Sequence, residues 1–284
     1  MAALGGWPLR WRAALVTGTA DARPEEVFRV AGPSLWPFIA ACGTVTIFAA
    51  ELMGLRWAAV LGAGVIVVAV IGWNWPDPPP MTEAEETEFE HRHRLPVRAG
   101  GSLAIARWGT GLVILFFSIA FASFLLAYFY LRLENEQWPP LGISMPRFGV
   151  ALVATAAVVV SAGAMYGALR AIRRGSSSGL RTGLAISILA GATAVGIQAS
   201  ELVGLTFDSH THAYGSIFHA VGWFVVTLAA GGVGMAALTL YWATRHNYTA
   251  RRHVPVVNAA QFWAAAVIMW LVGLATIYLV PYLT

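Results

Sequence analysis

The sequence predicts an all-α membrane protein, a polytopic bundle of about seven transmembrane helices arranged as a two-helix unit and a five-helix unit. Of its 284 residues, 58% are hydrophobic and only 11% are charged, whereas soluble domains carry about 25% charged residues. Several apolar runs reach the roughly 20 residues that a helix needs to cross a bilayer. Arginines gather in every second connection between these runs, which is typical of a multi-pass membrane protein.

Seven apolar runs are long enough to span the membrane as helices, which satisfy their own backbone hydrogen bonds in lipid. They cover residues 35–53, 57–75, 108–131, 148–171, 180–205, 216–243 and 259–282. Small residues are dense in the later runs, for example in GATAVG and AAGGVGMAA. Such residues let helix backbones approach closely, so they favour helix packing in lipid.

The polar stretches between the runs predict four parts of the chain. Residues 1–34 form an N-terminal segment, 35–75 the two-helix unit, 76–107 a charged linker and 108–284 the five-helix bundle. The linker begins with PDPPP, which favours a stiff, extended chain. It continues with TEAEETEFEHRHR, acidic first and basic last, which suits the dipole of a helix.

The basic residues predict the orientation of the chain in the membrane. All 18 are arginines, and a cytoplasmic N-terminus leaves only Arg56, Arg132 and Arg147 in the outer connections. The other fifteen then lie on the cytoplasmic side, as the positive-inside rule requires. The odd number of spans places the C-terminus outside. Because the arginines follow the spans, we interpret the positive charge as a topology signal and exclude nucleic-acid binding.

Glu201 is the first candidate functional residue, because an ionisable side chain near the end of a membrane span is a functional hypothesis by default. Gln198 lies three residues earlier and shares its helix face. Two interpretations stay open: Glu201 has a functional role, or it is solvated or bonded to a neighbour and purely structural. We interpret Glu51 and Arg56 as an interfacial ion pair.

The histidines and the single cysteine offer little chemistry. His210, His212 and His219 suggest a metal site, but we favour solvated loop histidines, with Asp208 and Ser209 as helix caps. For His91 and His93 a pH-sensing or metal role stays open, but we favour a solvated, charged helix in the linker. Cys42 is the single cysteine of the sequence, so a disulfide within the chain is excluded. No span carries a histidine pair for haem iron, and CxxxC, HExxH and phosphate-loop motifs are absent from the sequence.

Three stretches resemble subunit III of the haem-copper oxidases (the cytochrome c oxidase subunit III family). IQASELVGLTFDSHTHAYGSIFHAVGW matches the family's LQxxE and YGSxF segments, with Tyr214 and Ser216 in corresponding places. WPPLGI, beginning at Trp138, matches the family's WPPxGI loop. NAAQFWAAAVIMWLVGLATIYLVPYL is similar to the family's last helix, with Trp263 at the matching spacing. The resemblance covers residues 108–284 well and the first hundred residues loosely.

The chain departs from the family pattern at several polar positions. Where the family has a mid-membrane glutamate in the third span, this chain has Ile119. Phe224 and Thr227 replace the family's FHGLHV histidines, and Ala264 and Val267 replace its WHFVD histidine and aspartate. Separately, ARPEEVFRVAGPSLWPFIAACG resembles the tail of fused subunit I–III oxidases.

The resemblance implies an accessory subunit with no cofactor or metal of its own, in a complex that reduces oxygen to water and moves protons outward. Haem and copper would lie in partner subunits I and II, and electrons would come from cytochrome c, with a quinol oxidase as the alternative. The chain would stabilise the catalytic subunit and hold phospholipid in the cleft between its helical units, in a bacterial plasma membrane. Glu201, Gln198, Tyr214, Ser216, Trp138 and Trp263 are the candidate functional or packing residues. None is expected to be catalytic.

Two other classes of protein stay open. A small membrane transporter or channel needs polar or broken helices near the midplane, and the spans offer little of either. The other class is an anchor subunit of a different respiratory complex. An optical spectrum of the material that co-purifies with the chain distinguishes these classes.

Overall fold

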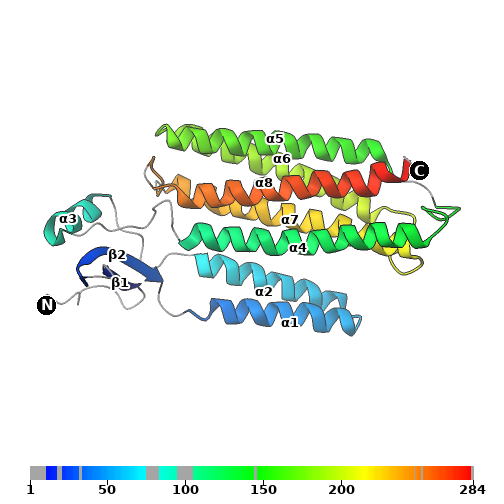
Figure 1. The fold of residues 1–284 in the computed structure, drawn as a ribbon, viewed down its shortest axis with the longest axis horizontal. Coiled ribbons are helices and arrows are strands. Elements are labelled where there is room, and N and C mark those ends of the chain that lie inside the picture. Colours follow the sequence, from blue (N-terminus) through cyan, green and yellow to red (C-terminus); the bar gives the residue numbers. More distant parts are fainter. Residues whose placement is uncertain are drawn as a thin grey trace. The chain divides into compact units, whose positions relative to one another are not determined.

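The computed structural model describes residues 11–17, 21–31, 34–74, 83–94, 105–143, 146–245, 247–250 and 252–282 (Figure 1). The chain divides into two compact units, Met1–Ala99 and Gly100–Thr284. This boundary falls within the predicted linker, and the four-part division itself stays a prediction.

The first unit begins with a β-hairpin that the sequence analysis did not predict. Strands β1 (Trp11–Thr17) and β2 (Pro24–Ala31) are antiparallel, and Leu15 lies opposite Val27. Valines and a phenylalanine favour these strands, but the segments are too short to stand out beside the membrane spans. The hairpin therefore adds a small sheet to the predicted helical protein.

The described part of the first unit also contains the helices α1 (Trp36–Leu52), α2 (Arg56–Asn74) and the charged α3 (Glu83–His93). Helices α1 and α2 pack closely because Gly43 and Gly62 face each other. A Cβ atom on either glycine would lie 2.8 Å from the other's carbonyl oxygen. The turn between the helices uses Gly54 at a φ of +69°, a conformation that favours glycine. The side chains of Glu51 and Arg56 lie outside the described part of the structure, so the ion pair between them stays a prediction.

The second unit confirms the predicted helix bundle. It contains α4 (Ile105–Glu134), α5 (Phe148–Arg173), α6 (Ser177–Val203), α7 (Ala213–Thr244) and α8 (Val254–Leu274). These five helices of the described chain are long and apolar enough to cross a membrane, and α1 and α2 are shorter apolar helices. A π-helical turn (η1, Ala275–Leu279) and a 3₁₀ turn (η2, Val280–Tyr282) extend α8.

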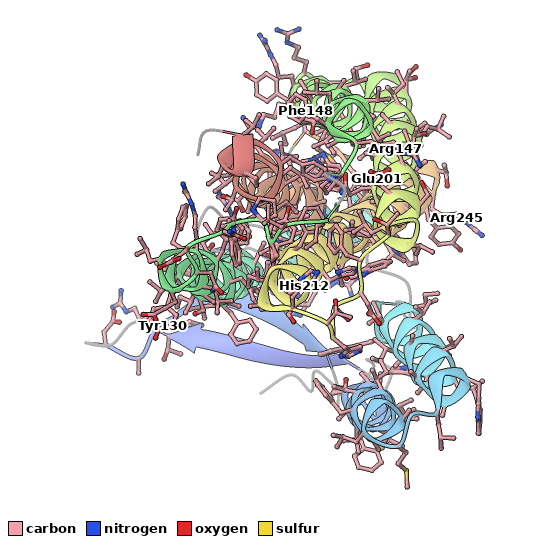
Figure 2. The ribbon with its side chains drawn as sticks, turned by 90° about the vertical axis from the view of Figure 1, so that its right-hand side faces the viewer. Tyr130, Arg147, Phe148, Glu201, His212 and Arg245 are labelled. Carbon is pink, nitrogen blue, oxygen red and sulfur yellow. The ribbon has the colours of Figure 1, made fainter. Side chains whose placement is uncertain are left out.

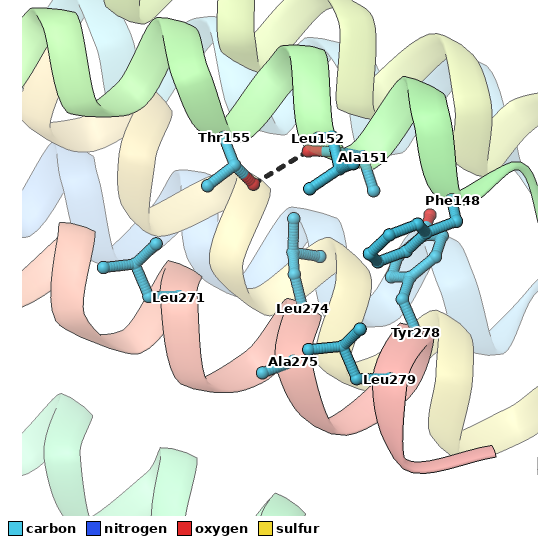
Figure 3. Close-up of a pocket in the computed structure, with 9 residues that line it drawn as sticks. All are labelled: Phe148, Ala151, Leu152, Thr155, Leu271, Leu274, Ala275, Tyr278 and Leu279. Carbon is cyan, nitrogen blue, oxygen red and sulfur yellow. Dashed lines mark hydrogen bonds between the residues drawn. The ribbon is translucent and has the colours of Figure 1, made fainter. Parts of the chain in front are cut away.

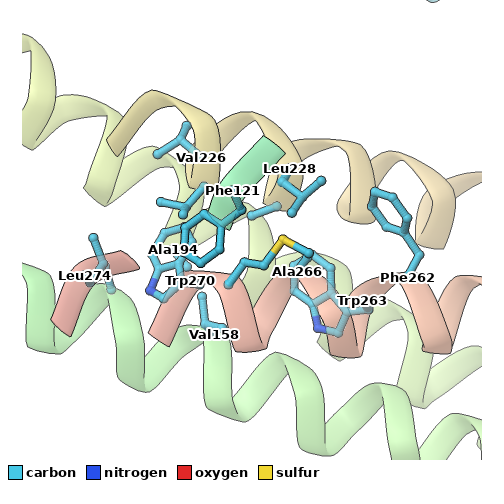
Figure 4. Close-up of a cluster of buried hydrophobic side chains, with 14 of the residues drawn as sticks. Phe121, Val158, Ala194, Val226, Leu228, Phe262, Trp263, Ala266, Trp270 and Leu274 are labelled. Atoms are coloured by element: carbon cyan, nitrogen blue, oxygen red, sulfur yellow. The ribbon is translucent and has the colours of Figure 1, made fainter. Parts of the chain in front are cut away.

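Helices α7 and α8 form the centre of this bundle (Figure 1). Helix α5 packs on α6, α6 on α7 and α7 on α8, while α4 packs on both α7 and α8 and α5 also touches α8. The core is rich in aromatic side chains, including the fully buried Trp270 and the nearly buried Trp263 (Figure 4). The Trp263 ring lies against Gly191 and Gly232, where no larger side chain fits without a shift. Small residues thus admit the large rings.

Polar side chains within the spans are mostly bonded inside the bundle. Thr239 and Thr276 donate to the carbonyl four residues earlier, each at 2.8 Å. Ser161 of α5 donates to the carbonyl of Ser187 in α6 at 2.6 Å. Because lipid offers no hydrogen-bond partners, these contacts are what allow polar residues in a membrane span.

Candidate functional site: the α6–α7 end of the bundle

Five of the six candidate residues meet at one end of the second unit. This α6–α7 end comprises residues 135–143, 146–147 and 204–212, the helix ends beside them and the last turns of α8. Figure 2 views the structure from this end, where Arg147 and Glu201 lie beside each other. The sixth candidate, Trp263, lies in the bundle core instead, which favours the packing interpretation of this residue.

Glu201 is buried in the last turn of α6, and its carboxylate is bonded. Its Oε1 accepts a hydrogen bond from the backbone N–H of Arg147 at 3.0 Å. Arg147 is the residue that precedes the first turn of α5. Carboxylates are favourable at the N-terminal end of a helix, because that end carries partial positive charge. Glu201 thereby fastens the α4–α5 loop to α6, which favours the structural interpretation of this residue.

Gln198 connects α6 to the end of α8. Its Nε2 donates to the hydroxyl of Tyr278 at 3.0 Å, and both side chains are buried. Tyr278 lies in the π-helical turn, a wider turn that is frequent at functional sites. The Oε1 of Gln198 has no hydrogen-bond partner among the described residues.

A chain of ring contacts joins the α4–α5 loop to three helices. Trp138 packs edge-on against Tyr128 of α4, at 5.6 Å between ring centroids, and against Tyr214 of α7, at 5.2 Å. Tyr214 continues to Phe218 at 5.8 Å, and Phe218 to Tyr278 at 5.4 Å. Such edge-to-face pairs stabilise beyond their buried area. Trp138 and Tyr214 therefore hold the loop on the helix ends.

The start of α7 differs from the prediction, which placed the helix at residue 216 and its caps at Asp208 and Ser209. The helix begins at Ala213, and His212 is the cap: its Nδ1 accepts the N–H of Gly215 at 2.7 Å. Ser216 donates through Oγ to the carbonyl of Ser209 at 2.6 Å, so it closes the loop. The prediction was wrong because a histidine ring nitrogen takes the place of the usual hydroxyl or carboxylate cap.

The three histidines of this segment do not converge. His210 is exposed, His212 caps α7, and the Nδ1 of His219 lies 3.0 Å from the carbonyl of Gly215 on its own helix. Beside them, the backbone N–H of Ser209 lowers the pKa of the exposed Asp208. No group of three or more histidine, cysteine or acidic side chains that could hold a metal exists among the described residues.

Arg147, Tyr278, Tyr128 and Phe218 belong to the site but were not predicted. Phe218 was noticed only as part of a motif, and Tyr278 has the sequence position of an interfacial aromatic residue. Their partners lie as many as 80 residues away along the chain. No local pattern in one sequence pairs residues over that distance.

Comparison with known proteins identifies the family to which this chain belongs. The family model described as "Cytochrome c oxidase subunit III" matches residues 26–282. The chain belongs to the cytochrome c oxidase subunit III family. Cytochrome c oxidase subunit 3 of Thermostichus vulcanus is 26% identical over 164 residues, which cover 57% of this chain and 81% of that protein. Those of Oryctolagus cuniculus and Mus musculus are 27% and 26% identical, each covering 61% of this chain and 68% of the relative.

This subunit III chain fills one of its unusual positions with aromatic packing. Phe224, which stands where the resemblance places a histidine, stacks on Phe121 with 5.9 Å between ring centroids. It also meets Phe124 and Phe117 edge-on, at 5.3 and 6.2 Å. Ile119 and Ala264, at two other departures, are exposed on apolar helices. In this family member these positions contribute apolar surface and packing.

Proposed function

We propose that this chain is the accessory, non-redox subunit III of a proton-pumping haem-copper oxidase that reduces oxygen to water with electrons from cytochrome c. The single observation that carries the proposal is the family match over residues 26–282, which includes both groups of apolar helices. The relatives are named subunit 3 of cytochrome c oxidase, a complex that is an oxidoreductase.

The accessory role is supported by what the side chains of the site do. Glu201, Gln198, Trp138 and His212 each bond or pack onto another part of the same bundle. Haem iron in oxidases is held by side-chain ligands such as histidine. The histidines in the described part of the chain lie on the charged linker helix, in loops or near the ends of the long helices. Haem and copper would therefore be held by subunits I and II, and no step of the reaction is assigned to this chain.

The proposed contribution of this chain is to stabilise the catalytic subunit and to bind lipid. Large apolar side chains on α4 and α5 are exposed, for example Leu112, Phe116, Leu126 and Val159. In a membrane such surfaces contact lipid tails or neighbouring helices, and close packing drives association there. We place the N-terminus in the cytoplasm and the α6–α7 end outside a bacterial plasma membrane, because the arginines concentrate at the opposite end.

The test is purification of the tagged, full-length chain from its native membrane in mild detergent. We expect haem absorbance, bound copper and oxygen consumption supported by reduced cytochrome c, all above those of an unrelated membrane protein with the same tag. Oxygen consumption that quinol supports and reduced cytochrome c does not would show that the electron donor is quinol. A colourless preparation that consumes no oxygen would overturn the proposal.

A further inference from the structure

Two histidines hold the same glycine at the start of α7, and they need opposite protonation states at Nδ1. The Nδ1 of His212 accepts the N–H of Gly215 at 2.7 Å, so this nitrogen must be free of a proton. The Nδ1 of His219 lies 3.0 Å from the carbonyl oxygen of Gly215. A carbonyl oxygen can only accept, so this second nitrogen must carry a proton. Acid therefore leaves the bond of His219 in place and breaks the bond of His212.

The cap made by His212 holds the loop 204–212 on the first turn of α7 (Figure 2). A Cβ atom on Gly215 would meet the carbonyl oxygen of Asp208 and lie 2.8 Å from Cε1 of His212, so the loop and the ring lie directly on this glycine. Phe207 of the same loop is buried, and its ring centroid lies 5.9 Å from that of His212. The cap thus keeps an apolar ring of the loop covered.

Protonation of His212 weakens this arrangement in two ways. It removes the lone pair that accepts the N–H of Gly215, and it places positive charge at the N-terminal end of α7, which is already positive. The ring is only half-buried, so protons from water reach it. The stability that the cap contributes is therefore present at high pH. It is lost as the pH falls through the range in which histidine side chains ordinarily titrate, between about pH 8 and about pH 5.

The other titratable side chains of this segment do not hold the N–H of Gly215. The backbone N–H of Ser209 is the main cause that lowers the pKa of the exposed Asp208, so its carboxylate stays charged throughout that pH range. His210 is exposed on the loop. His219 keeps its bond to the carbonyl oxygen whether its ring is neutral or charged.

The elements around the loop contribute three further titratable groups. Glu201, in the last turn of α6, accepts the backbone N–H of Arg147. Tyr214 has its ring centroid 6.2 Å from that of His212. Tyr278 is the titratable residue that lines the groove between α5 and α8 (Figure 3), and it is engaged by Gln198. Tyrosines ordinarily ionise only near pH 10, so these two do not respond in the range of histidine.

We propose that His212 is a pH-sensitive latch, which holds the loop 204–212 on α7 when its ring is neutral and releases the loop when its ring is protonated. The inference goes beyond the proposed function, because it assigns a conformational response to acid to one loop. With the proposed orientation, the latch lies on the side to which the oxidase moves protons, so the loop loosens as protons accumulate there. The latch itself follows from the contacts of Gly215 and does not depend on the oxidase assignment.

The experiment measures hydrogen–deuterium exchange of the amides of residues 213–218 by mass spectrometry, in the full-length chain purified in mild detergent. Two variants fix the latch at any pH: His212→Asn keeps a cap acceptor, and His212→Ala removes it. Each variant is compared with the wild-type chain at the same pH, so the intrinsic pH dependence of exchange cancels. At about pH 8 the wild-type chain should exchange like His212→Asn. At about pH 5 it should exchange about fivefold faster than His212→Asn and match His212→Ala.

Three matched controls test whether His212 alone is the sensor. His210→Gln, His219→Gln and Glu201→Gln each remove one other titratable group, and each should keep the wild-type response to acid. Loss of the response in one of them, an acid response that persists in His212→Asn, or wild-type exchange that follows His212→Asn at both pH values would overturn the proposal. If His212→Ala does not fold, the comparison with His212→Asn still decides. Because the readout is amide exchange, a chain that brings down no haem can still pass this test.

Discussion

At the scale of single residues, the carboxylate of Glu201 acts as a hydrogen-bond acceptor for the start of α5. Glu201→Gln keeps an acceptor oxygen, so we expect oxidase turnover to change by no more than a few-fold. Glu201→Ala removes the acceptor from the part-buried N–H of Arg147, and the loss of a hydrogen bond to a charged group typically costs about 1.5–3 kcal/mol. Turnover of the purified complex and unfolding of the chain in SDS–detergent mixtures measure the two effects.

The matched control for Glu201 is Glu134→Gln, which changes an exposed carboxylate at the same end of the bundle. It should leave both turnover and stability unchanged. A tenfold fall in turnover for Glu201→Gln alone corresponds to about 1.4 kcal/mol in the barrier. That result would contradict the structural interpretation and give Glu201 a functional role.

The bond between Gln198 and Tyr278 is suited to a double-mutant cycle. Tyr278→Phe leaves the Gln198 amide buried without this partner. Gln198→Leu leaves the Tyr278 hydroxyl without the amide that donates to it. Hydrogen bonds in membrane bundles average about 0.6 kcal/mol, with values up to about 1.7. We expect a coupling free energy in this range from SDS unfolding of the two single variants and the double variant. Fully additive changes would show that the bond contributes nothing to stability.

These residues mark where sequence reasoning succeeded and where it ended. The three-residue spacing placed Gln198 and Glu201 on one helix face, and both are buried at the end of α6, as a shared face requires. Their partners, the Arg147 backbone and the Tyr278 hydroxyl, depend on how α5 and α8 pack against α6. That packing is a tertiary property, and it left no trace in the spacing of residues near Glu201.

At the scale of helices, glycine determines how closely α5 and α6 approach. A Cβ atom on Gly183 would lie 2.8 Å from the Ala168 Cβ and 2.9 Å from its backbone atoms. Gly183→Ala should therefore destabilise the bundle by about 1–3 kcal/mol, because overpacking forces the backbones apart. Gly163→Ala is the matched control: a Cβ there meets no atom within 4 Å, and alanine favours helix over glycine by about 1 kcal/mol. Equal loss of stability in both variants, measured by SDS unfolding, would contradict this account.

Helix positions were predictable from sequence because a span in lipid must be long, apolar and helical. The predicted start of α8 at residue 259 was late, since the helix begins at Val254 and accommodates a proline in its first turn. Helix α7 likewise starts before its predicted residue because His212 serves as the cap. The hairpin β1–β2 was not predicted, because hydrophobic length carries no information about short strands outside the spans.

At the scale of the whole molecule, the family match and the charge asymmetry combine into a testable orientation. Arginines at the α5–α6 connection include Arg173 and Arg174, both exposed at the end of α5. With the proposed cytoplasmic N-terminus, this connection lies inside, and its positive charge opposes translocation. A single introduced cysteine reports the orientation: Ser178→Cys, in a chain whose own cysteine is removed by Cys42→Ser, should resist an impermeant maleimide in intact cells.

Reversing the charge of that connection should weaken this topology. Arg173→Glu with Arg174→Glu removes two cations and adds two anions, and it also places acidic groups at a helix C-terminus, where they are unfavourable. We expect Ser178→Cys to become labelled in a fraction of molecules and the assembled yield to fall. The pair Arg173→Gln and Arg174→Gln should give an effect on labelling of the same sign and nearly the same size, because positive residues set orientation and acidic residues contribute little. Labelling of Ser178→Cys in intact cells before any arginine is changed would place the α5–α6 connection outside and reverse the proposed orientation, while the helix bundle itself would stand.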